Sequence, residues 1–335
     1  MQNNYDVIIV GGGPAGLACA LELANSKYSV LLLDRKKILG DKPCGGGICE
    51  KEVAVKYEPS FVKIIKKQEI VLNNFSINFE HTIKRITFER EDLAFFQEKK
   101  LSNKVNIKIV KETNVLKISA SEVVTNKGTF SYNYLVGADG ASSLVRRYLK
   151  LPFAYCFGMY YKIWGEYDTF VSYYDIKRIK LGYIWEFPHK KYNNIGIYYH
   201  PKNLKAVDAK KILQEYLRNH NYNFEEKDFL ASPINYDYRG YKFGNIFLIG
   251  DAGGFTSRMH GGGINNGIIS GNEVAKLIMD AGYKPVELLQ IINSRKKEDG
   301  MIDFAETLPN WLLGFLGRIL ILLYKIPYFE KVLPF

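Results

Sequence analysis

The stretch that decides the fold is Tyr5-Asp6-Val7-Ile8-Ile9-Val10-Gly11-Gly12-Gly13-Pro14-Ala15-Gly16, near the start of the 335-residue chain. Its first half is an apolar run with the length and composition of a buried parallel strand. The glycines then predict a tight turn, and Pro14 suits the first turn of a helix. A second apolar run, residues 28–33, completes a predicted order of strand, turn, helix and strand.

The glycines of this turn have separate roles in a dinucleotide-binding unit. The first, Gly11, permits the tight turn, Gly13 lets the backbone approach a pyrophosphate, and Gly16 allows close packing of helix on strand. The N–H groups at the helix start are donors for the phosphates. Asp34 ends the second strand, where an acidic residue accepts a ribose hydroxyl. The predicted nucleotide-binding residues are Gly11, Gly13, Ala15, Gly16, Asp34 and Arg35.

Two further segments indicate that the dinucleotide is FAD. They are Leu135-Val136-Gly137-Ala138-Asp139-Gly140 and Ile249-Gly250-Asp251-Ala252-Gly253-Gly254. These segments resemble the Asp-Gly and Gly-Asp fingerprints of the p-hydroxybenzoate hydroxylase-type flavoprotein superfamily. The resemblance implies that Asp251 contacts the ribityl chain of FAD and that the helix opening at Gly263 and Ile264 points at the flavin O2 atom. We therefore predict an FAD-dependent oxidoreductase.

The predicted FAD-binding domain is discontinuous. Residues 157–199 hold short tyrosine-rich segments with turn residues between them, a pattern typical of an antiparallel sheet. Residues 244–251 then return to a buried strand and a glycine-rich turn. The predicted fold class is α/β, a Rossmann-type FAD-binding domain with an inserted antiparallel β-sheet substrate domain. We assign residues 1–57, 82–150 and 236–290 to the FAD-binding domain, residues 58–81 and 151–235 to the substrate domain, and residues 291–335 to a C-terminal helical segment.

Within that superfamily the chain most resembles the geranylgeranyl reductase family, which saturates carbon–carbon double bonds of isoprenoid chains. The resemblance rests on Lys42-Pro43-Cys44-Gly45-Gly46-Gly47, and on Tyr183-Ile184-Trp185-Glu186-Phe187-Pro188 followed by Asn194-Ile195-Gly196. It departs from the family at Arg258-Met259-His260-Gly261-Gly262-Gly263, where members usually have Pro and then Gly-Glu-Gly.

The family resemblance implies further site residues. Cys44, Gly45 and Gly46 are expected beside the flavin, Arg90 on the cofactor, and the backbone of Val115 against the adenine. The expected substrate-contacting residues are Tyr183, Trp185 and Phe187. The implied substrate is an isoprenoid lipid of the geranylgeranyl type. No metal is expected, because no Cys/His cluster has the spacing of a zinc site.

The implied chemistry is hydride delivery from the flavin N5 atom to one alkene carbon, with a proton arriving at the other. Cys44 is one candidate proton donor or relay, although a small side chain that simply fits under the flavin ring explains it equally well. His260 is the other candidate, because imidazole titrates near neutral pH, but a histidine here also serves to stabilise a loop. The electron donor is expected to be NAD(P)H or ferredoxin.

Two rival activities share these fingerprints: a flavin monooxygenase and a flavin-dependent halogenase. Aromatic hydroxylases commonly carry His and then Pro after the Gly-Asp-Ala run, whereas Gly254 stands at the His position here. The halogenases have a similar Trp-x-Trp-x-Ile-Pro segment, but the Cys-Gly-Gly-Gly loop argues against them. A non-enzymatic flavin-bearing electron carrier is the rival from another class.

Composition restricts the partners and the setting. The net charge is +11, but the lysines are scattered and no nucleic-acid-binding motif accompanies them, so no nucleic-acid partner is expected. Four unevenly spaced cysteines indicate a reducing, cytoplasmic setting. The apolar residues 311–324 are too short and interrupted to span a bilayer. Followed by Lys325, Tyr328 and Lys331, they form a segment that either packs on the core or lies peripherally on the cytoplasmic face of a membrane.

Overall fold

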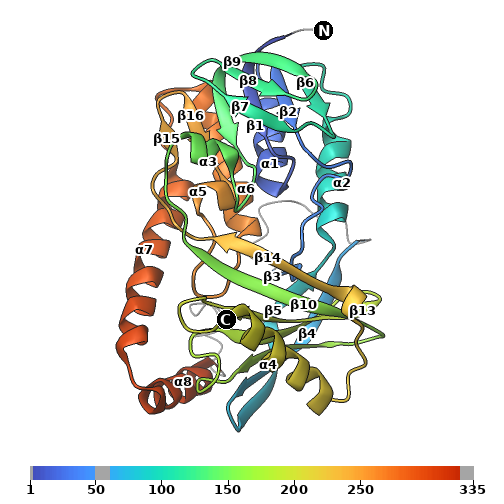
Figure 1. Cartoon of the computed structure of the whole chain (residues 1–335), viewed down its shortest axis with the longest axis vertical. Coiled ribbons are helices and arrows are strands. Elements are labelled where there is room, and N and C mark those ends of the chain that lie inside the picture. The colour runs from blue at the N-terminus through green and yellow to red at the C-terminus, as the bar shows by residue number, and fades with distance from the viewer. Residues whose placement is uncertain (1–2, 50–60, 325–335) are drawn as a thin grey trace.

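The structure is a computed structural model, and it describes residues 3–49 and 61–324. Two large β-sheets lie one above the other in Figure 1, with helices packed on and beside them. The predicted α/β fold, with a Rossmann-type domain and a second sheet made from inserted segments, is confirmed. The predicted membrane residues Lys325, Tyr328 and Lys331 lie outside the described residues.

Sheet A contains the βαβ unit. Its strand order is β15-β16-β9-β1-β2-β6, and β8 links the hairpin partner β7 to β9. The pairs of β1 with β2 and β9, of β2 with β6 and of β16 with β9 are all parallel. The strands are β1 (Asn4–Val10), β2 (Val30–Leu33), β6 (Ile107–Val110), β7 (Val115–Ile118), β8 (Glu122–Thr125), β9 (Gly128–Gly137), β15 (Lys242–Phe243) and β16 (Ile246–Leu248).

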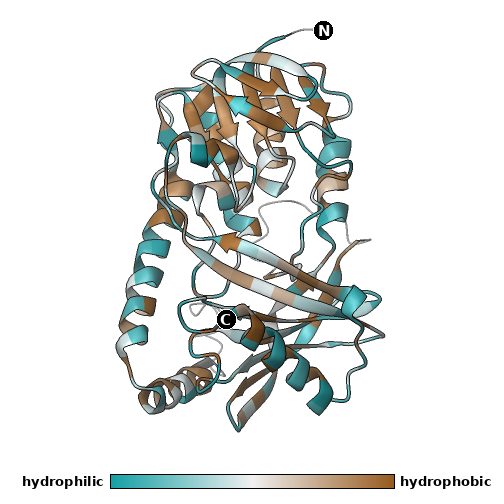
Figure 2. Ribbon diagram, in the orientation of Figure 1, coloured by the Kyte–Doolittle hydropathy of each residue, from teal (hydrophilic) through white to brown (hydrophobic). Residues whose placement is uncertain are grey.

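One face of sheet A is covered by α1 (Pro14–Leu23), α2 (Arg90–Leu101) and α6 (Ile264–Met279). A Cβ on Gly271 of α6 would lie 2.3 Å from the carbonyl O of Ala15, so this glycine lets α6 touch α1. The short helices α3 (Leu144–Tyr148) and α5 (Gly250–Gly253) follow β9 and β16. Figure 2 shows that the strands of sheet A are largely apolar, as expected when both faces are covered.

Sheet B has the order β14-β10-β13-β12-β11-β4-β5-β3, with α4 (Ala206–Asn219) and the 3-10 turn η2 (Glu226–Asp228) beside it. Its strands are β3 (Gly47–Cys49), β4 (Lys63–Leu72), β5 (Phe75–Thr87), β10 (Tyr155–Trp164), β11 (Thr169–Tyr174), β12 (Tyr183–Pro188), β13 (Tyr192–Tyr199) and β14 (Phe229–Asn235). Sheet B thus takes in residues 47–49 and 82–87, which we had assigned to the FAD-binding domain.

One pairing in sheet B differs from the expected antiparallel pattern. Strands β4 and β11 are parallel, with Thr169 opposite Lys67 and Tyr174 opposite Leu72. The β4–β5 hairpin docks on β11 as a unit, because the backbone N–H of Asn73 in its turn donates to the carbonyl of Tyr174 at 2.8 Å. The direction of β4 is therefore set by this docking and not by a neighbouring turn.

The C-terminal helices join the two sheets on one side. Helix α7 (Val286–Thr307) runs from sheet A towards sheet B, and α8 (Asn310–Tyr324) follows it at the far end (Figure 1). The expected domain boundary at residue 291 falls inside α7. Within residues 3–49 and 61–324, no helix combines the length and apolarity needed to cross a bilayer.

Candidate functional site

A cavity of about 630 Å³ lies where the two sheets face each other. It extends from the turn between β1 and α1, past the loop of residues 42–48, to strands β10–β13 of sheet B and the loop of residues 256–263. The structure therefore brings together most of the predicted site residues. Those that line the cavity are Gly13, Ala15, Cys44, Gly45, Gly46, Arg90, Tyr183, Trp185, Phe187, Asp251, His260, Gly263 and Ile264.

The nucleotide end of the cavity fits a phosphate-bearing ligand. No side chain of the described residues caps the N-terminus of α1, so its N–H groups are available to an anion. A Cβ on Gly13 would meet only a guanidinium nitrogen of Arg90, at 3.5 Å, so packing within the chain does not require this glycine. The buried Nε of Arg90 has no hydrogen-bond partner among the described residues. These three observations match a pyrophosphate lying over the turn.

The other two turn glycines serve the fold itself. A Cβ on Gly11 would lie 2.3 Å from the carbonyl O of Ala138, and one on Gly16 would lie 2.0 Å from the carbonyl O of Gly11. The carboxylate of Asp34 accepts the backbone N–H of Gly12 at 2.6 Å and so ties the turn to the end of β2. Neither glycine lines the cavity, and neither does Asp34.

Two other predicted cofactor residues also stand outside the cavity lining. Arg35 is exposed on the loop after β2. Val115 begins β7, and its side chain belongs to the same buried cluster as Tyr5 and Leu33. Contacts of these residues with the adenosine half of a dinucleotide stay predictions.

Asp251 forms the charged centre of the site. Its Oδ2 atom is 2.6 Å from Nζ of Lys42, and its Oδ1 atom accepts the hydroxyl of Thr256 at 2.8 Å. Burial alone would raise the pKa of Asp251, but the charges of Lys42 and Arg90 outweigh it and the pKa is lowered. The carboxylate is therefore ionised at neutral pH. Lys42 belongs to the quoted Lys-Pro-Cys-Gly motif, but its role was not predicted from the sequence.

Helix α6 starts beside Asp251. A Cβ on Gly263, the residue before the helix, would lie 3.2 Å from Oδ1 of Asp251. No described side chain caps this helix, so its N–H groups, beginning near Ile264, face the cavity as donors. The expected contact of this helix start with the flavin stays a prediction.

The Cys-Gly-Gly-Gly loop packs directly on sheet B, where Trp185 and Phe187 form the aromatic wall of the cavity. A Cβ on Gly45 would lie 3.0 Å from the ring of Phe187, and one on Gly47 would lie 2.8 Å from the same ring. On its other side, Phe187 stacks on Phe170 with 4.1 Å between ring centroids. Glycine is therefore needed at both positions because the ring of Phe187 occupies the space of any side chain there. Phe187 lies more than a hundred residues later in the chain.

Trp185 is held by a second set of contacts. Its indole lies against Gly196 on the paired strand, and its Nε1 donates to Oδ1 of Asn194 at 2.9 Å. The amide of Asn194 in turn donates from Nδ2 to the carbonyl of Cys44 at 3.1 Å. Asn194 thus fixes both the wall and the loop. The quoted Asn-x-Gly motif contained this residue, but its role emerges only from the fold.

His260 lies on the cavity side of the loop of residues 256–263. Its Nδ1 accepts the backbone N–H of Gly262 at 3.1 Å, so the neutral ring carries its proton on Nε2. The carbonyl of His260 accepts the hydroxyl of Tyr183 at 2.8 Å. Burial raises the pKa of Tyr183, so this hydroxyl stays protonated.

Helix α7 anchors that loop from outside. Arg258 is 2.7 Å from the carboxylate of Asp303 and 3.1 Å from that of Glu306. The hydroxyl of Ser257 donates to Glu298 at 2.8 Å. Arg258 stands where the resemblance led us to expect a proline-containing loop. Its ion pairs tie the loop of residues 256–263 to α7.

The far arm of the cavity is largely apolar and leads toward α8, although Lys180 also lines it and donates to the backbone carbonyl of Glu306. Its lining includes Tyr174, Ile176 and Leu181. Ile176 belongs to the same buried cluster as Leu313 and Ile321 of α8. The cavity therefore connects a polar, cationic end at sheet A with a largely apolar end near a C-terminal helix, where Lys180 is the charged lining residue.

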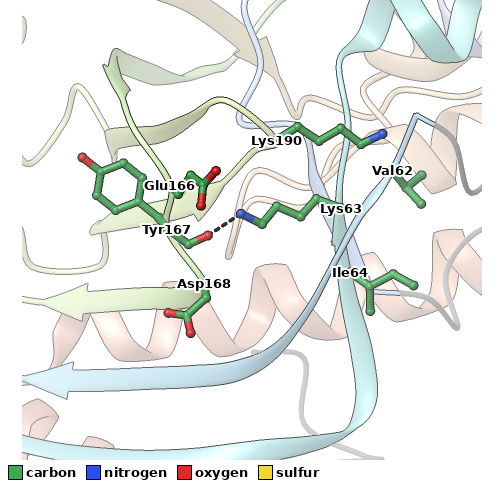
Figure 3. A pocket seen from close by; sticks show the side chains of 7 residues that line it. All are labelled: Val62, Lys63, Ile64, Glu166, Tyr167, Asp168 and Lys190. Atoms are coloured by element: carbon green, nitrogen blue, oxygen red, sulfur yellow. Dashed lines mark hydrogen bonds between the residues drawn. The ribbon is translucent and has the colours of Figure 1, made fainter.

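A second hollow, drawn in Figure 3, lies outside this cavity. Its central residue, Lys63, donates to the backbone carbonyls of Tyr167 and His189, so it ties β4 to loops of sheet B. The ammonium group of Lys63 is therefore engaged in holding the fold together. The hollow contains none of the predicted site residues.

Comparison with known proteins agrees with this geometry. Residues 5–154 match the family model described as pyridine nucleotide-disulphide oxidoreductase. Over 83% of its length the chain is 30% identical to an uncharacterised protein of Methanosarcina barkeri, of which it covers 75%. It is 24% identical, over 83% of its length, to a digeranylgeranylglycerophospholipid reductase of Methanocaldococcus jannaschii, of which it covers 78%.

A solved structure has the same fold. It is that of a geranylgeranyl bacteriochlorophyll reductase-like protein from Thermoplasma acidophilum, with a TM-score of 0.79 and 19% identity over 94% of this chain and 91% of that chain. The cofactor of the present chain is FAD, and the prediction of an FAD-dependent oxidoreductase is confirmed. The chain belongs to the geranylgeranyl reductase family of FAD-dependent oxidoreductases.

Proposed function

We propose that this protein reduces carbon–carbon double bonds in geranylgeranyl or related isoprenoid lipid chains. The observation that carries the proposal is the contact between the Cys44–Gly47 loop and the wall formed by Trp185 and Phe187. This contact places an apolar, water-excluding surface beside the expected position of the flavin. The apolar arm past Tyr174 and Ile176 then offers a path for a long hydrocarbon chain.

Each part of the site has a task in this reaction. Reduced FAD supplies the hydride when it is bound. The wall holds one alkene against the cofactor and keeps water out, which favours the reactive geometry. Cys44 lies in the cavity beside the wall and supplies a proton to the second alkene carbon. His260, on the opposite loop, is the alternative donor through its Nε2–H group.

The experiment is an anaerobic half-reaction. FAD bound to the protein is reduced with dithionite and mixed with a geranylgeranyl lipid, with the fully saturated phytanyl lipid as control. We expect reoxidation only with the unsaturated lipid, and a product heavier by two hydrogens for each bond reduced. Failure of every prenyl lipid to reoxidise the flavin would refute the proposal. Oxygen-dependent product formation, or dependence on halide, would instead support the monooxygenase or the halogenase.

Two variants separate the proton donors. In Cys44→Ser the reoxidation rate should fall while FAD affinity stays the same, whereas His260→Gln should leave the rate nearly unchanged if Cys44 is the donor. Equal rates in Cys44→Ser and the parent protein would remove Cys44 from the chemistry and leave His260 as the candidate. Both rates are read from the same stopped-flow flavin absorbance.

The electron donor is proposed to be NAD(P)H or ferredoxin. Stopped-flow reduction of the bound FAD with NADH, NADPH and reduced ferredoxin, each without lipid, distinguishes them. The physiological donor should reduce the flavin faster than turnover.

We also propose that α8 contacts a lipid surface, from which the substrate enters. Three of its apolar side chains are strongly exposed: Trp311 at 72%, Phe315 at 58% and Leu322 at 50%. Its opposite side packs near the apolar end of the cavity. An exposed apolar surface of this kind, on a helix that packs near the apolar arm of the cavity, suits an interfacial helix.

Sedimentation with liposomes tests this contact. The double variant Trp311→Ser/Phe315→Ser should lose binding, while Val105→Ser, which removes an isolated exposed apolar side chain elsewhere, should bind like the parent. Equal sedimentation of all three proteins would refute the contact. Such a result would leave the reductase proposal untouched, because the half-reaction can be run with detergent-dispersed lipid.

A further inference from the structure

We propose that His189 and Glu89 are positioning residues for Cys44. They fix the peptide group between Gly45 and Gly46 so that its N–H is held on the Cys44 sulfur. The inference rests on the proposed function, in which Cys44 gives up its proton to the substrate.

The geometry centres on a single peptide group. Its carbonyl, from Gly45, lies 3.0 Å from Nε2 of His189. Its N–H, from Gly46, donates to Sγ of Cys44 at 3.4 Å. Because a peptide group is planar and rigid, an interaction that fixes the carbonyl also fixes the direction of the N–H. The contact with His189 therefore determines how the donor meets the sulfur.

His189 is itself held on its other side. Its Nδ1 lies 3.0 Å from Oε1 of Glu89, and its ring stacks on Tyr192 with 4.7 Å between centroids and 7° between planes. The hydroxyl of Tyr192 donates to the same carboxylate. Both partners of the imidazole are pure acceptors, so the ring with hydrogens on both nitrogens satisfies both contacts. The side chain of His189 is only 4% exposed, so the imidazole ring itself is kept away from water.

Glu89 is the negatively charged partner of His189 and Tyr192. Burial alone would raise its pKa, but the hydrogen bonds from His189 and Tyr192 outweigh burial and lower the pKa to about 2. The carboxylate therefore stays ionised through the neutral range. Lys162 adds a more distant cation, with its Nζ 3.7 Å from Oε2.

The loop has little freedom to relax away from these contacts. Gly46 adopts a φ of +69°, a conformation that side chains rarely take. A Cβ there would lie 2.7 Å from Cε1 of His189 and 2.4 Å from the carbonyl O of Phe88. The N–H of Phe88 also donates to the carbonyl of Gly46 at 3.1 Å. The glycine is thus enclosed between the histidine ring and the end of β5.

This arrangement has a chemical consequence for proton transfer. When the S–H bond of Cys44 breaks and a C–H bond forms on the substrate, the electron pair of the S–H bond remains on sulfur, while the other alkene carbon receives hydride from reduced FAD. The N–H of Gly46 already lies where this negative charge develops, so it stabilises the charge without reorganisation. The contact of His189 Nε2 with the carbonyl polarises the same peptide and strengthens the N–H as a donor. A proton from water restores the thiol after the product leaves.

The test measures the reactivity of Cys44 directly. Alkylation by iodoacetamide at a fixed pH is followed by peptide mass spectrometry at Cys44, in the parent, His189→Phe and Glu89→Gln. We expect both variants to react about tenfold more slowly, because the thiolate loses a strong donor. The control is His220→Phe, an exposed histidine at the C-terminal cap of α4 whose ring contacts Tyr216 away from the loop, and it should react at the parental rate.

Alkylation rates within about twofold of the parent in both variants would overturn the proposal, since one hydrogen bond to a charged sulfur is worth more than that. If His189→Phe does not fold, Glu89→Gln alone decides, because it keeps the size of the side chain and removes only its charge. The assay uses neither lipid nor reductant, so its outcome is independent of whether the reductase proposal holds.

The half-reaction then separates positioning from a purely structural role. In the parent background His189→Phe should slow flavin reoxidation without changing FAD affinity. In a Cys44→Ser background the same substitution should have no further effect. An equal slowing in both backgrounds would show that His189 acts without Cys44 and would refute the inference.

Discussion

Replacing Gly196 by alanine should displace the indole of Trp185 and open the aromatic wall. The new Cβ would lie 2.3 Å from Cζ2 of Trp185 and 2.5 Å from the carbonyl O of Met159. Carbon atoms in good contact are about 3.5 Å apart, so one neighbour must move by roughly 1 Å. The carbonyl belongs to the backbone of β10, which is paired on both sides with β13 and β14, so the indole is the neighbour that moves, and the close contact with the carbonyl adds strain that this movement does not relieve.

The cost follows from the contacts that this movement breaks. Overpacking of this kind costs about 1–3 kcal/mol. Displacing the ring also breaks the 2.9 Å bond from Trp185 to Asn194, which contributes about 1 kcal/mol. We therefore expect Gly196→Ala to lower the free energy of unfolding by about 2–4 kcal/mol. Denaturant unfolding of the FAD-free protein, followed by circular dichroism, measures this.

Two further variants make the result specific. Trp185→Phe removes the ring atoms that the new Cβ meets, so the double variant should be more stable than the sum of the single effects predicts. Gly300→Ala is the control, because a Cβ at this position in α7 would have no described atom within 4 Å, and it should be neutral or stabilising by up to about 1 kcal/mol. Additive effects of the two site substitutions, or a Gly196→Ala variant within about 0.5 kcal/mol of the parent, would refute this packing argument.

Three other predictions use the same structure. Because the pKa of Glu89 is lowered to about 2 from an ordinary value of 4.5, its contribution to stability is present above pH 4.5 and is lost as the pH falls toward 2. Allowing for its partial exposure, this is about 1–2 kcal/mol, and Glu89→Gln should remove that part of the acid sensitivity in unfolding curves. Gly13→Ala should leave the FAD-free protein stable but weaken FAD binding at least about tenfold, whereas Gly16→Ala should destabilise the protein itself; flavin fluorescence and thermal melting separate the two. Lys42→Met should raise the pKa of Asp251 and weaken FAD binding, and an unchanged dissociation constant would remove Lys42 from the site.

The nucleotide half of the fold could be predicted because its signals are local. Residues 5–33 carry an apolar strand, a glycine turn, a helix and a second strand in one continuous stretch, and the structure has β1, α1 and β2 there. The helix expected to open at Gly263 and Ile264 corresponds to α6. Each of these depends on neighbours within a few residues, which sequence patterns record well.

The parts that could not be predicted depend on distant pairs. The parallel docking of β4 on β11 joins residues about a hundred positions apart, and no local pattern encodes its direction. The contact of His189 with Gly45 and that of Tyr192 with Glu89 likewise span more than a hundred residues. Histidine and glutamate at such positions have no motif of their own, and only the fold shows that they meet the glycine loop.

The two short motifs that carried the family resemblance turn out to be one physical unit. Gly45 and Gly47 are needed because Phe187 occupies the space of their side chains, and Gly196 is needed because Trp185 does the same. A larger residue in the loop would therefore displace the wall, and a smaller residue in the wall would leave the loop unsupported. Either change alone should impair the site, while a paired change that keeps the shared volume should be tolerated. The resemblance thus reflects mutual packing at the cavity, which explains why both motifs occur together in this chain.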